Sequence, residues 1–296
     1  MIPGTTAARG FVLLQRLLPQ HTLSRLIHAL ARVRVRSIKN ALIRGFVRGF
    51  KPDMSDARQT DPLAYESFNA FFTRELAAGA RPQPQDRQAI ASPVDGVVSQ
   101  IGYLDAQAIL QAKGRTFSVG ALLGGAAAEI AAFDGGAFAT LYLAPGNYHR
   151  IHMPCAGHLR TARHVPGSLF SVNAVTAAAV DALFARNERV VCLFDDGRQP
   201  FSMVLVGALF VGSISTVWHG EITPPTRRRA RELAPVPSAA ARLERGAMMG
   251  WFNMGSTVIL LFPKGRLQWL GGLAAGAPVR VGQPLGRIQD PARPPP

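Results

Sequence analysis

The stretch GWFNMGST at residues 250–257 runs into the apolar segment VILLF at 258–262, which ends at Pro263. Its small residues favour a turn, and the β-branched, leucine-rich segment after it is typical of a buried strand. Within the turn, Gly255 offers an unhindered carbonyl directly before the hydroxyl of Ser256. The stretch therefore predicts a buried β core, entered either by an ordinary turn or by a turn in which a side chain attacks the backbone.

The chain of 296 residues is long enough for one large domain or two ordinary ones. Apolar residues make up 48% of it, with 29 Gly and 22 Pro, which indicates a turn-rich folded protein. Cys155 and Cys192 are the only cysteines. They provide no disulfide framework and no cysteine-based metal spacing, so a reducing compartment is expected.

The net charge of +15 is concentrated at the N-terminus. Residues 1–51 hold ten Lys or Arg and no acidic residue, whereas residues 52–296 hold 23 basic and 18 acidic residues, a net of +5. A protein that binds a polyanion usually spreads its positive charge over the working surface. The distribution therefore indicates a local role for the N-terminus, and no nucleic-acid partner is predicted.

The basic N-terminal residues also show apolar side chains at helical spacing. No apolar run approaches the ~20 residues that span a bilayer, and no secretory signal pattern is present. We therefore expect residues 1–52 to form amphipathic helices that lie in an anionic lipid surface. The alternative is a helical layer packed on the core with a solvated basic face. The predicted apolar faces are Phe11, Leu14, Leu17 and Leu18; Leu23, Leu26, Ile27 and Leu30; and Ile38, Leu42, Phe46 and Phe50.

The remainder of the chain divides into a polar connection, residues 53–90, and a β-rich domain, residues 91–296. Residues 65–76 of the connection are expected to form a short aromatic-rich helix that packs in the core. Beyond residue 91, short apolar runs of period two alternate with Gly, Pro and Asp turns. The pattern predicts an α+β protein, with N-terminal amphipathic helices followed by a mainly antiparallel β-sandwich or barrel-like core. Its strands are expected at 97–98, 138–143, 190–194, 203–211 and 257–262, with one helical interruption at 174–185 and an exposed loop at 222–247.

Three polar stretches stand out from the β pattern: SPVDGVV at 92–98, YHRIHMP at 148–154, and the turn at 255–257. Four of the seven histidines lie between residues 149 and 164. A metal site is one interpretation, but the HxxH spacing lacks a zincin helix and no cysteine pair assists it. A structural cluster is a second. The third is a relay in which a carboxylate orients an imidazole, which deprotonates a serine.

The same stretches carry a family resemblance that covers nearly the whole chain. Taken together and in order, they resemble the bacterial phosphatidylserine decarboxylases, pyruvoyl-dependent membrane enzymes of phospholipid biosynthesis. The matching motifs are LLPQH (17–21) with LSR (23–25), FNAFFTR (68–74), SPVDG (92–96), YHRIHMP (148–154), FSVN (170–173), WHGE (218–221) and MGST (254–257).

The resemblance implies a proenzyme, or zymogen, in which Asp95, His152 and Ser256 form a self-cleavage triad. Autocatalytic cleavage between Gly255 and Ser256 would give a β chain, residues 1–255, and an α chain, residues 256–296. Ser256 would become the covalent pyruvoyl cofactor, and no metal is implied. His149 would lie near the substrate and assist proton transfer.

One position departs from the family pattern. Acidic residues often follow the glycine that corresponds to Gly246, whereas Ala247 and Met248 follow it here. Neither side chain can supply a charge, so any electrostatic help from those acids is absent. The triad positions are intact, and cleavage is still expected.

The implied reaction is that of a lyase. The amine of phosphatidylserine would form a Schiff base with the pyruvoyl ketone, which accepts electrons as carbon dioxide departs, and phosphatidylethanolamine would be released. The implied partners are phosphatidylserine in an anionic membrane, the α and β chains of one precursor, and a homo-oligomer of such pairs. The implied location is peripheral, on the cytoplasmic face of the inner cell membrane.

Two other functions remain open at this point. One is a non-catalytic, membrane-tethered β-sandwich carrier or regulatory module, because PVDG (93–96) and VGQPLG (281–286) resemble the turns of such domains. The other is a metal hydrolase with His and Asp ligands.

Overall fold

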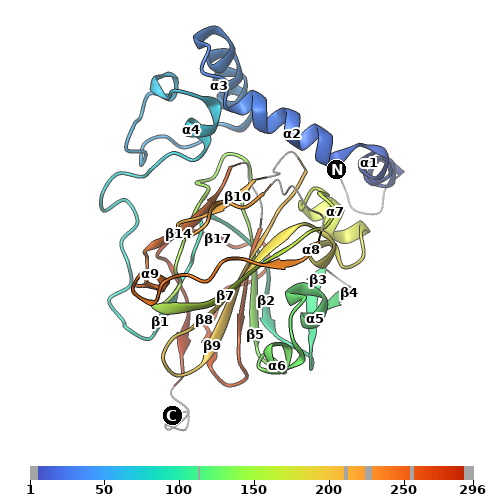
Figure 1. Ribbon diagram of the computed structural model, residues 1–296, viewed down its shortest axis with the longest axis vertical. Helices are drawn as coiled ribbons and strands as arrows, with labels where there is room; N and C mark the ends of the chain where they lie inside the picture. Colours follow the sequence, from blue (N-terminus) through green and yellow to red (C-terminus); the bar gives the residue numbers. More distant parts are fainter. Residues whose placement is uncertain (1–5, 113, 210–212, 224–228, 254–256, 290–296) are drawn as a thin grey trace.

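The computed structural model describes residues 6–112, 114–209, 213–223, 229–253 and 257–289 (Figure 1). Its first elements are the three expected helices: α1 (Thr6–Leu17), α2 (Gln20–Ala31) and α3 (Arg36–Phe50). They lie across one end of the molecule, over the ends of the β-strands (Figure 1). Among the described residues, no helix combines the length and apolar character needed to cross a bilayer.

The N-terminal helices meet the rest of the chain partly through polar side chains. Gln15 Oε1 accepts a hydrogen bond from the Ser171 amide at 2.7 Å, and Gln20 Oε1 accepts one from the Leu169 amide at 2.7 Å. Several apolar side chains of these helices are exposed instead of packed in the core, with Leu17 75% and Leu26 63% exposed. The apolar faces are thus only partly used for packing within the chain.

The connection after α3 contains one 3-10 turn, η1 (Pro62–Ala64), and one short helix, α4 (Phe68–Phe72). The prediction of a helix over 65–76 was therefore too long. Ser67 caps α4 by accepting a hydrogen bond from the Ala70 amide. Phe71 and Phe72 are fully buried and pack edge-on against Phe46 of α3, as expected for core residues.

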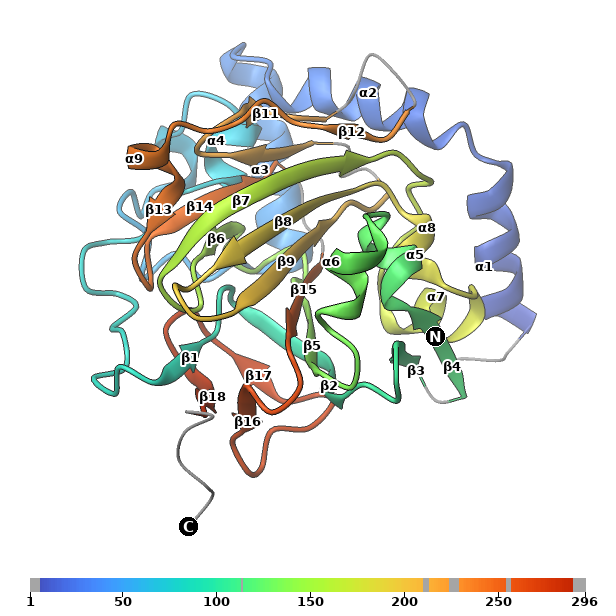
Figure 2. The ribbon, with the colours of Figure 1, turned by 60° about the horizontal axis from the view of Figure 1, so that its bottom comes forward.

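The main sheet contains nine described strands, and all of its pairings are antiparallel. Figure 2 shows β7, β8, β9 and β15 side by side. The strand order is β12 (Arg231–Glu232), β7 (Gly157–Val165), β8 (Arg189–Asp195), β9 (Pro200–Val206), β15 (Thr257–Phe262), β5 (Ala137–Tyr142), β2 (Gly96–Tyr103) and β17 (Pro278–Val279), with β13 (Arg242–Leu243) also on β7.

The opening sequence stretch forms the centre of this sheet. Every residue of β15 is buried. Because successive side chains of a strand point to opposite faces, Val258, Leu260 and Phe262 join one apolar cluster, and Ile259 and Leu261 join another. A strand covered on both faces has no position for a solvated polar side chain, which explains the unbroken apolar run.

Smaller sheets and short helices surround the main sheet. A four-stranded sheet has the order β11 (Gly220–Glu221), β10 (Ile214–Thr216), β14 (Met248–Phe252) and β6 (Arg150–His152). The others are β1 (Ala89–Ala91), β18 (Pro284–Ile288) and β16 (Leu267–Trp269), and the hairpin β3 (Ala108–Ala112) and β4 (Arg115–Ser118). The short helices are α5 (Val119–Leu123), α6 (Ala127–Ala131), α7 (Ala174–Ala179), α8 (Leu183–Arg186) and α9 (Ser238–Ala241).

The α+β class and the mainly antiparallel core are confirmed, and the described strands form open sheets without a closed barrel. Three details of the prediction were wrong. The strand expected at 203–211 ends at Val206, and residues 207–209 lie outside any strand, while 210–212 are outside the described residues. Residues 174–185 form two helices, and α5, α6 and α9 interrupt the β pattern as well; helices of four or five residues are too short to show a helical period. The predicted loop at 222–247 contributes β12 and β13, which cover the edge of β7.

Candidate functional site

Asp95 lies at the start of β2, in a loop held close to β5. A Cβ atom at Gly96 would stand 2.3 Å from the Tyr142 carbonyl oxygen, so this position requires glycine. On the other side, the Ser92 carbonyl accepts a hydrogen bond from Gly282, and the Ser92 amide donates one to Gln283. The loop is therefore clamped between β5 and the 281–283 turn.

The Asp95 carboxylate is buried and is bound by a cation. Arg81 donates from Nη2 to Oδ2 at 2.6 Å and from Nε to Oδ1 at 3.1 Å, and the Val281 amide donates to Oδ1 at 2.8 Å. Arg81 also donates to Asp56 at 2.7 Å. The hydrogen bond with Asp95 raises the pKa of Arg81. A fork-shaped contact of this kind fixes both the position and the charge of the carboxylate.

His152 ends β6 and has a partner on each ring nitrogen. Nδ1 lies 2.8 Å from the Gly246 carbonyl oxygen and Nε2 lies 3.0 Å from the Tyr148 hydroxyl. Since a carbonyl can only accept, Nδ1 carries the hydrogen and the lone pair is on Nε2. Burial lowers the pKa of His152 and raises that of Tyr148 to about 12. His152 is therefore a neutral imidazole in a defined tautomer.

Asp95 and His152 occupy one site, although their hydrogen bonds go to different partners. The His152 amide donates to the Pro93 carbonyl at 2.9 Å, and the charge of Asp95 acts to raise the pKa of His152. The group that fixes the tautomer in this structure is the Gly246 carbonyl. The predicted orientation of the imidazole by Asp95, with a ring N–H donating to the carboxylate, stays a prediction about the reacting state.

His149 has a different environment from His152. It is fully buried, its ring lies 4.1 Å from that of Phe72, and its Nδ1 donates to the Asn147 carbonyl at 2.8 Å. Its Nε2 has no hydrogen-bond partner among the described residues. Burial, with a smaller contribution from Arg74, lowers its pKa to about 3. His149 is therefore a neutral imidazole packed against Phe72, and its Nε2 is free to accept a hydrogen bond.

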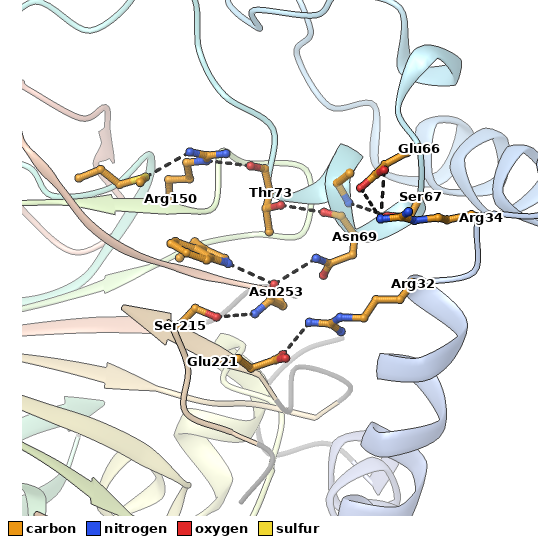
Figure 3. A pocket seen from close by; sticks show the side chains of 13 residues that line it. Arg32, Arg34, Glu66, Ser67, Asn69, Thr73, Arg150, Ser215, Glu221 and Asn253 are labelled. Atoms are coloured by element: carbon orange, nitrogen blue, oxygen red, sulfur yellow. Dashed lines mark hydrogen bonds and ion pairs between the residues drawn. The ribbon is translucent and has the colours of Figure 1, made fainter. Parts of the chain in front are cut away.

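Gly255 and Ser256 lie outside the described residues, but both flanks of residues 254–256 are well defined. Asn253 is buried, and its Nδ2 donates to Ser213 Oγ at 2.7 Å and to Ser215 Oγ at 3.0 Å. Its Oδ1 accepts hydrogen bonds from Asn69 at 3.1 Å and Trp251 at 3.2 Å (Figure 3).

The other flank is Thr257, the first residue of β15, which is fully buried between Tyr142 of β5 and Val206 of β9. The backbone also connects this region to the histidines, because the Phe252 amide donates to the His149 carbonyl at 3.0 Å. The interpretation of 250–257 as the entrance to a buried strand is confirmed for the described residues on both sides.

A cavity of about 530 Å³ opens beside Asn253 (Figure 3). Trp251, Ser215 and Asn253 lie on its β-sheet side, and residues from α4 and the end of α2 lie on the other. Charged side chains at the cavity form three ion pairs: Arg32 with Glu221 at 2.6 Å, Arg34 with Glu66 at 3.2 Å, and Arg150 with Glu75 at 3.0 Å.

A second cavity, of about 400 Å³, is lined by Asp95, Tyr148 and Arg81 together with residues from the end of α3. Both cavities are bordered by N-terminal residues, Arg32 and Arg34 in the first and Phe50 and Lys51 in the second. Asp95 is thus reached through a cavity next to the end of α3.

The four clustered histidines do not converge. His158 faces Ser238, and His164 is buried with its Nε2 3.0 Å from Glu188. Within the described ranges, no group of three or more His, Cys, Asp or Glu has metal-binding geometry. His149 and His152 therefore belong to the candidate site, whereas His158 and His164 belong to strand β7 of the main sheet.

Sequence reasoning did not identify Arg81, Asn253 or Glu221, and it gave no role to Tyr148. Tyr148 could have been found, because it lies in the same motif as both site histidines. The sequence around Arg81 does not indicate a role for it, since Arg81 lies 14 residues before Asp95 in an irregular connection. Long-range contacts of this kind are set by the fold alone.

Comparison with known proteins gives two family matches. The model described as phosphatidylserine decarboxylase matches residues 68–287, and a second, described as PSD, matches residues 11–51. Similar curated proteins are each named phosphatidylserine decarboxylase proenzyme. That of Azotobacter vinelandii is 52% identical over 94% of this chain and 98% of its own length. Those of Pseudomonas fluorescens Pf-5 and Methylococcus capsulatus are 53% and 48% identical, over 94% and 97% of this chain and 97% and 99% of their own lengths.

Proposed function

The chain belongs to the phosphatidylserine decarboxylase family and is a carboxy-lyase of phospholipid biosynthesis, and we propose that it makes its own electrophile by cleaving the bond between Gly255 and Ser256. The observation that carries the proposal is the neutral imidazole of His152, held in one tautomer with its lone pair on Nε2. An imidazole in that state is ready to act as a general base.

The first step is proton transfer from Ser256 to His152. The Tyr148 hydroxyl now occupies Nε2 of His152, so the serine hydroxyl replaces it before transferring its proton. The serine oxygen then attacks the Gly255 carbonyl, and the imidazolium returns the proton to the departing amide nitrogen. The product is an ester in place of the amide, with the Ser256 amine free.

Cleavage follows by elimination. Loss of the Ser256 Cα proton breaks the bond from Cβ to the ester oxygen, which releases residues 1–255 with a C-terminal carboxylate. The dehydroalanine left at position 256 tautomerises to an imine, and water hydrolyses the imine to a ketone and ammonia. We propose that Asp95, whose charge is fixed by Arg81, stabilises the imidazolium that forms on His152.

The surroundings of residues 254–256 fit a small carbonyl group. Two buried polar atoms near the flanks, His149 Nε2 and Thr257 Oγ1, have no hydrogen-bond partner among the described residues. A pyruvoyl ketone supplies an electron sink for the carbon that loses carbon dioxide. His149, whose pKa is about 3, is neutral at physiological pH, so its proposed role is to accept a hydrogen bond or a proton from the substrate amine.

We further propose that the enzyme works as a peripheral protein on the cytoplasmic face of the inner membrane. The N-terminal helices turn polar side chains such as Gln15 and Gln20 toward the core while Leu17 and Leu26 face outward. Exposed leucines beside many basic residues favour an anionic lipid surface. Phosphatidylserine in that surface is the proposed substrate, and phosphatidylethanolamine the product.

Mass spectrometry and gel electrophoresis of the purified protein test the proposal. We expect two chains, the smaller comprising residues 256–296 and lighter by one ammonia than a serine-headed peptide. Ser256→Ala should remain a single chain without decarboxylase activity. A wild-type protein that stays uncleaved, with an unmodified serine at 256, would show that the proposed chemistry is wrong.

A further inference from the structure

More basic than acidic side chains line the cavity beside Asn253. Three arginines, Arg32, Arg34 and Arg150, and two glutamates, Glu66 and Glu221, line it, and the remaining lining residues are uncharged. Resting on the function proposed above, we propose that this cavity is the subsite for the substrate headgroup and that Arg34 binds its phosphodiester. The ligand class is thus a glycerophosphoserine diester.

The cavity presents both signs of charge to a ligand. Its lining carries three positive and two negative side chains, and Glu75, the partner of Arg150, lies outside the lining. A phosphoserine headgroup carries negative charges on its phosphodiester and carboxylate and a positive charge on its ammonium. Arginines can therefore bind its anionic groups, and a glutamate can bind its ammonium.

Among the three arginines, Arg34 is the one most readily released to a ligand. Its ion pair with Glu66 spans 3.2 Å between side chains that are 73% and 61% exposed. An exposed pair of this kind contributes little, so an anion can replace Glu66 at small cost. The guanidinium fork matches the geometry of a phosphodiester.

The other two arginines are held more firmly. Arg32 donates to Glu221 at 2.6 Å, and Glu221 also binds His28 at 2.7 Å. Arg150 donates to the Thr73 carbonyl at 2.8 Å and pairs with Glu75 at 3.0 Å. Arg32 and Arg150 therefore contribute to the positive potential of the cavity. Arg34 is the arginine that can exchange its carboxylate partner for a ligand.

The cavity is also close enough to the proposed reacting group. Asn253 lines it and is three residues before Ser256. Consecutive Cα atoms are about 3.8 Å apart, so the Ser256 Cα lies within roughly 11 Å of the Asn253 Cα. In the headgroup, one oxygen and two carbons separate the phosphorus from the amine nitrogen. In the proposed binding mode, the phosphate binds Arg34 and the amine lies on the Asn253 side of the cavity.

Kinetics on a short-chain phosphatidylserine in uncharged detergent micelles test this assignment. Arg34→Gln should raise KM about tenfold, the loss expected for one charge-assisted contact, with kcat within about twofold of wild type and normal cleavage into two chains. Arg44→Gln is the matched control, because Arg44 is an exposed residue of α3 outside the cavity lining. It should leave KM unchanged.

Two soluble probes identify the source of the phosphate. Glycerophosphoserine should inhibit the wild type competitively and inhibit Arg34→Gln about tenfold more weakly, whereas inorganic phosphate at the same concentration should have little effect. Equal inhibition by inorganic phosphate would identify a general anion site and overturn the headgroup assignment. An unchanged KM in Arg34→Gln, or an equal rise in Arg44→Gln, would also overturn it. Failure of the proposed function is distinguishable, because the wild type itself would then lack cleavage and product.

Discussion

At the scale of single residues, the site depends on contacts that orient its acid and its base separately. Arg81 and the Val281 amide hold Asp95, whereas the Gly246 carbonyl and the Tyr148 hydroxyl hold His152. Asp95 therefore needs Arg81 as a positioning residue. A buried carboxylate without its cation favours the protonated form.

Substituting Arg81 should therefore slow self-cleavage. We expect Arg81→Gln to reduce the first-order rate of cleavage by about tenfold or more at pH 7, since a charge-assisted contact is worth about 1.5–3 kcal/mol. Arg81→Lys should recover part of the rate, because it keeps the charge and loses the fork. The readout is the fraction of two-chain product against time.

Arg287→Gln provides the control for this experiment, because it breaks the exposed ion pair with Asp86 at 3.1 Å and leaves the pairs of Arg81 with Asp95 and Asp56 intact. Its cleavage rate should equal that of the wild type. If Arg81→Gln also cleaves at the wild-type rate, Arg81 has no positioning role.

His149 should make stability depend on pH. Its folded-state pKa of about 3 lies below the unfolded value of about 6.5, so the unfolded chain binds the additional proton between these values. Stability is then full above pH 6.5 and falls as the pH drops toward 3. From this group alone, the free energy of unfolding should be about 2 kcal/mol lower at pH 5 than at pH 8.

Urea unfolding in a Ser256→Ala background, where the chain stays in one piece, measures this dependence. His149→Gln should be less stable at pH 8, because it loses the packing against Phe72, but its stability should fall by about 2 kcal/mol less between pH 8 and pH 5. An equal fall in both proteins would contradict a buried neutral His149.

At the scale of elements, Glu221 of β11 connects α2 to the segment before the proposed cleavage point. It accepts hydrogen bonds from His28 and Arg32 of the α2 end at 2.7 and 2.6 Å, and from Ser213. Ser213 in turn binds Asn253. Burial alone would raise the pKa of Glu221, but the hydrogen bonds from Ser213 and His28 lower it, so the carboxylate is ionised.

Removing this carboxylate should loosen α2 without unfolding the core. We expect Glu221→Ala to increase amide hydrogen exchange across residues 20–31 by about tenfold, because a charge-assisted contact is worth at least about 1.5 kcal/mol, while β8 and β9 exchange as in the wild type. Glu66→Ala, which breaks only an exposed pair, is the matched control. Equal protection of α2 in both variants would rule out this connection.

At the scale of the whole molecule, the described flanks of the proposed cleavage point connect several elements: Asn253 binds Asn69 of α4, Phe252 binds the His149 carbonyl, and Thr257 begins the central strand β15. Cleavage there would leave β15 between β9 and β5, with all its residues buried. Separating the two chains would then require removing the central strand of the main sheet and opening both apolar clusters. The α chain would also keep its Val281 contact with Asp95, so the site would remain assembled from both chains.

Sequence alone determined the elements whose side chains form a long regular pattern. Three amphipathic helices in the N-terminal 52 residues and the strand at 257–262 were predicted because their apolar side chains recur at regular spacing; the structure places the helices at 6–17, 20–31 and 36–50. Short helices such as α5 and α6 carry too few turns to show such spacing. The predicted Asp95, His152, Ser256 and His149 came from motifs together with their order along the chain, which is also local information.

Only the tertiary structure decided which groups those residues meet. Arg81 reaches Asp95, Gly246 reaches His152, and Glu221 reaches α2 across sequence separations of 14, 94 and up to 193 residues. Such contacts depend on how sheets and helices pack, and residues that meet only through packing show no regular spacing in the sequence. The sequence thus determined that residues 258–262 form a buried strand, and the fold determined which residues surround the turn at its entrance.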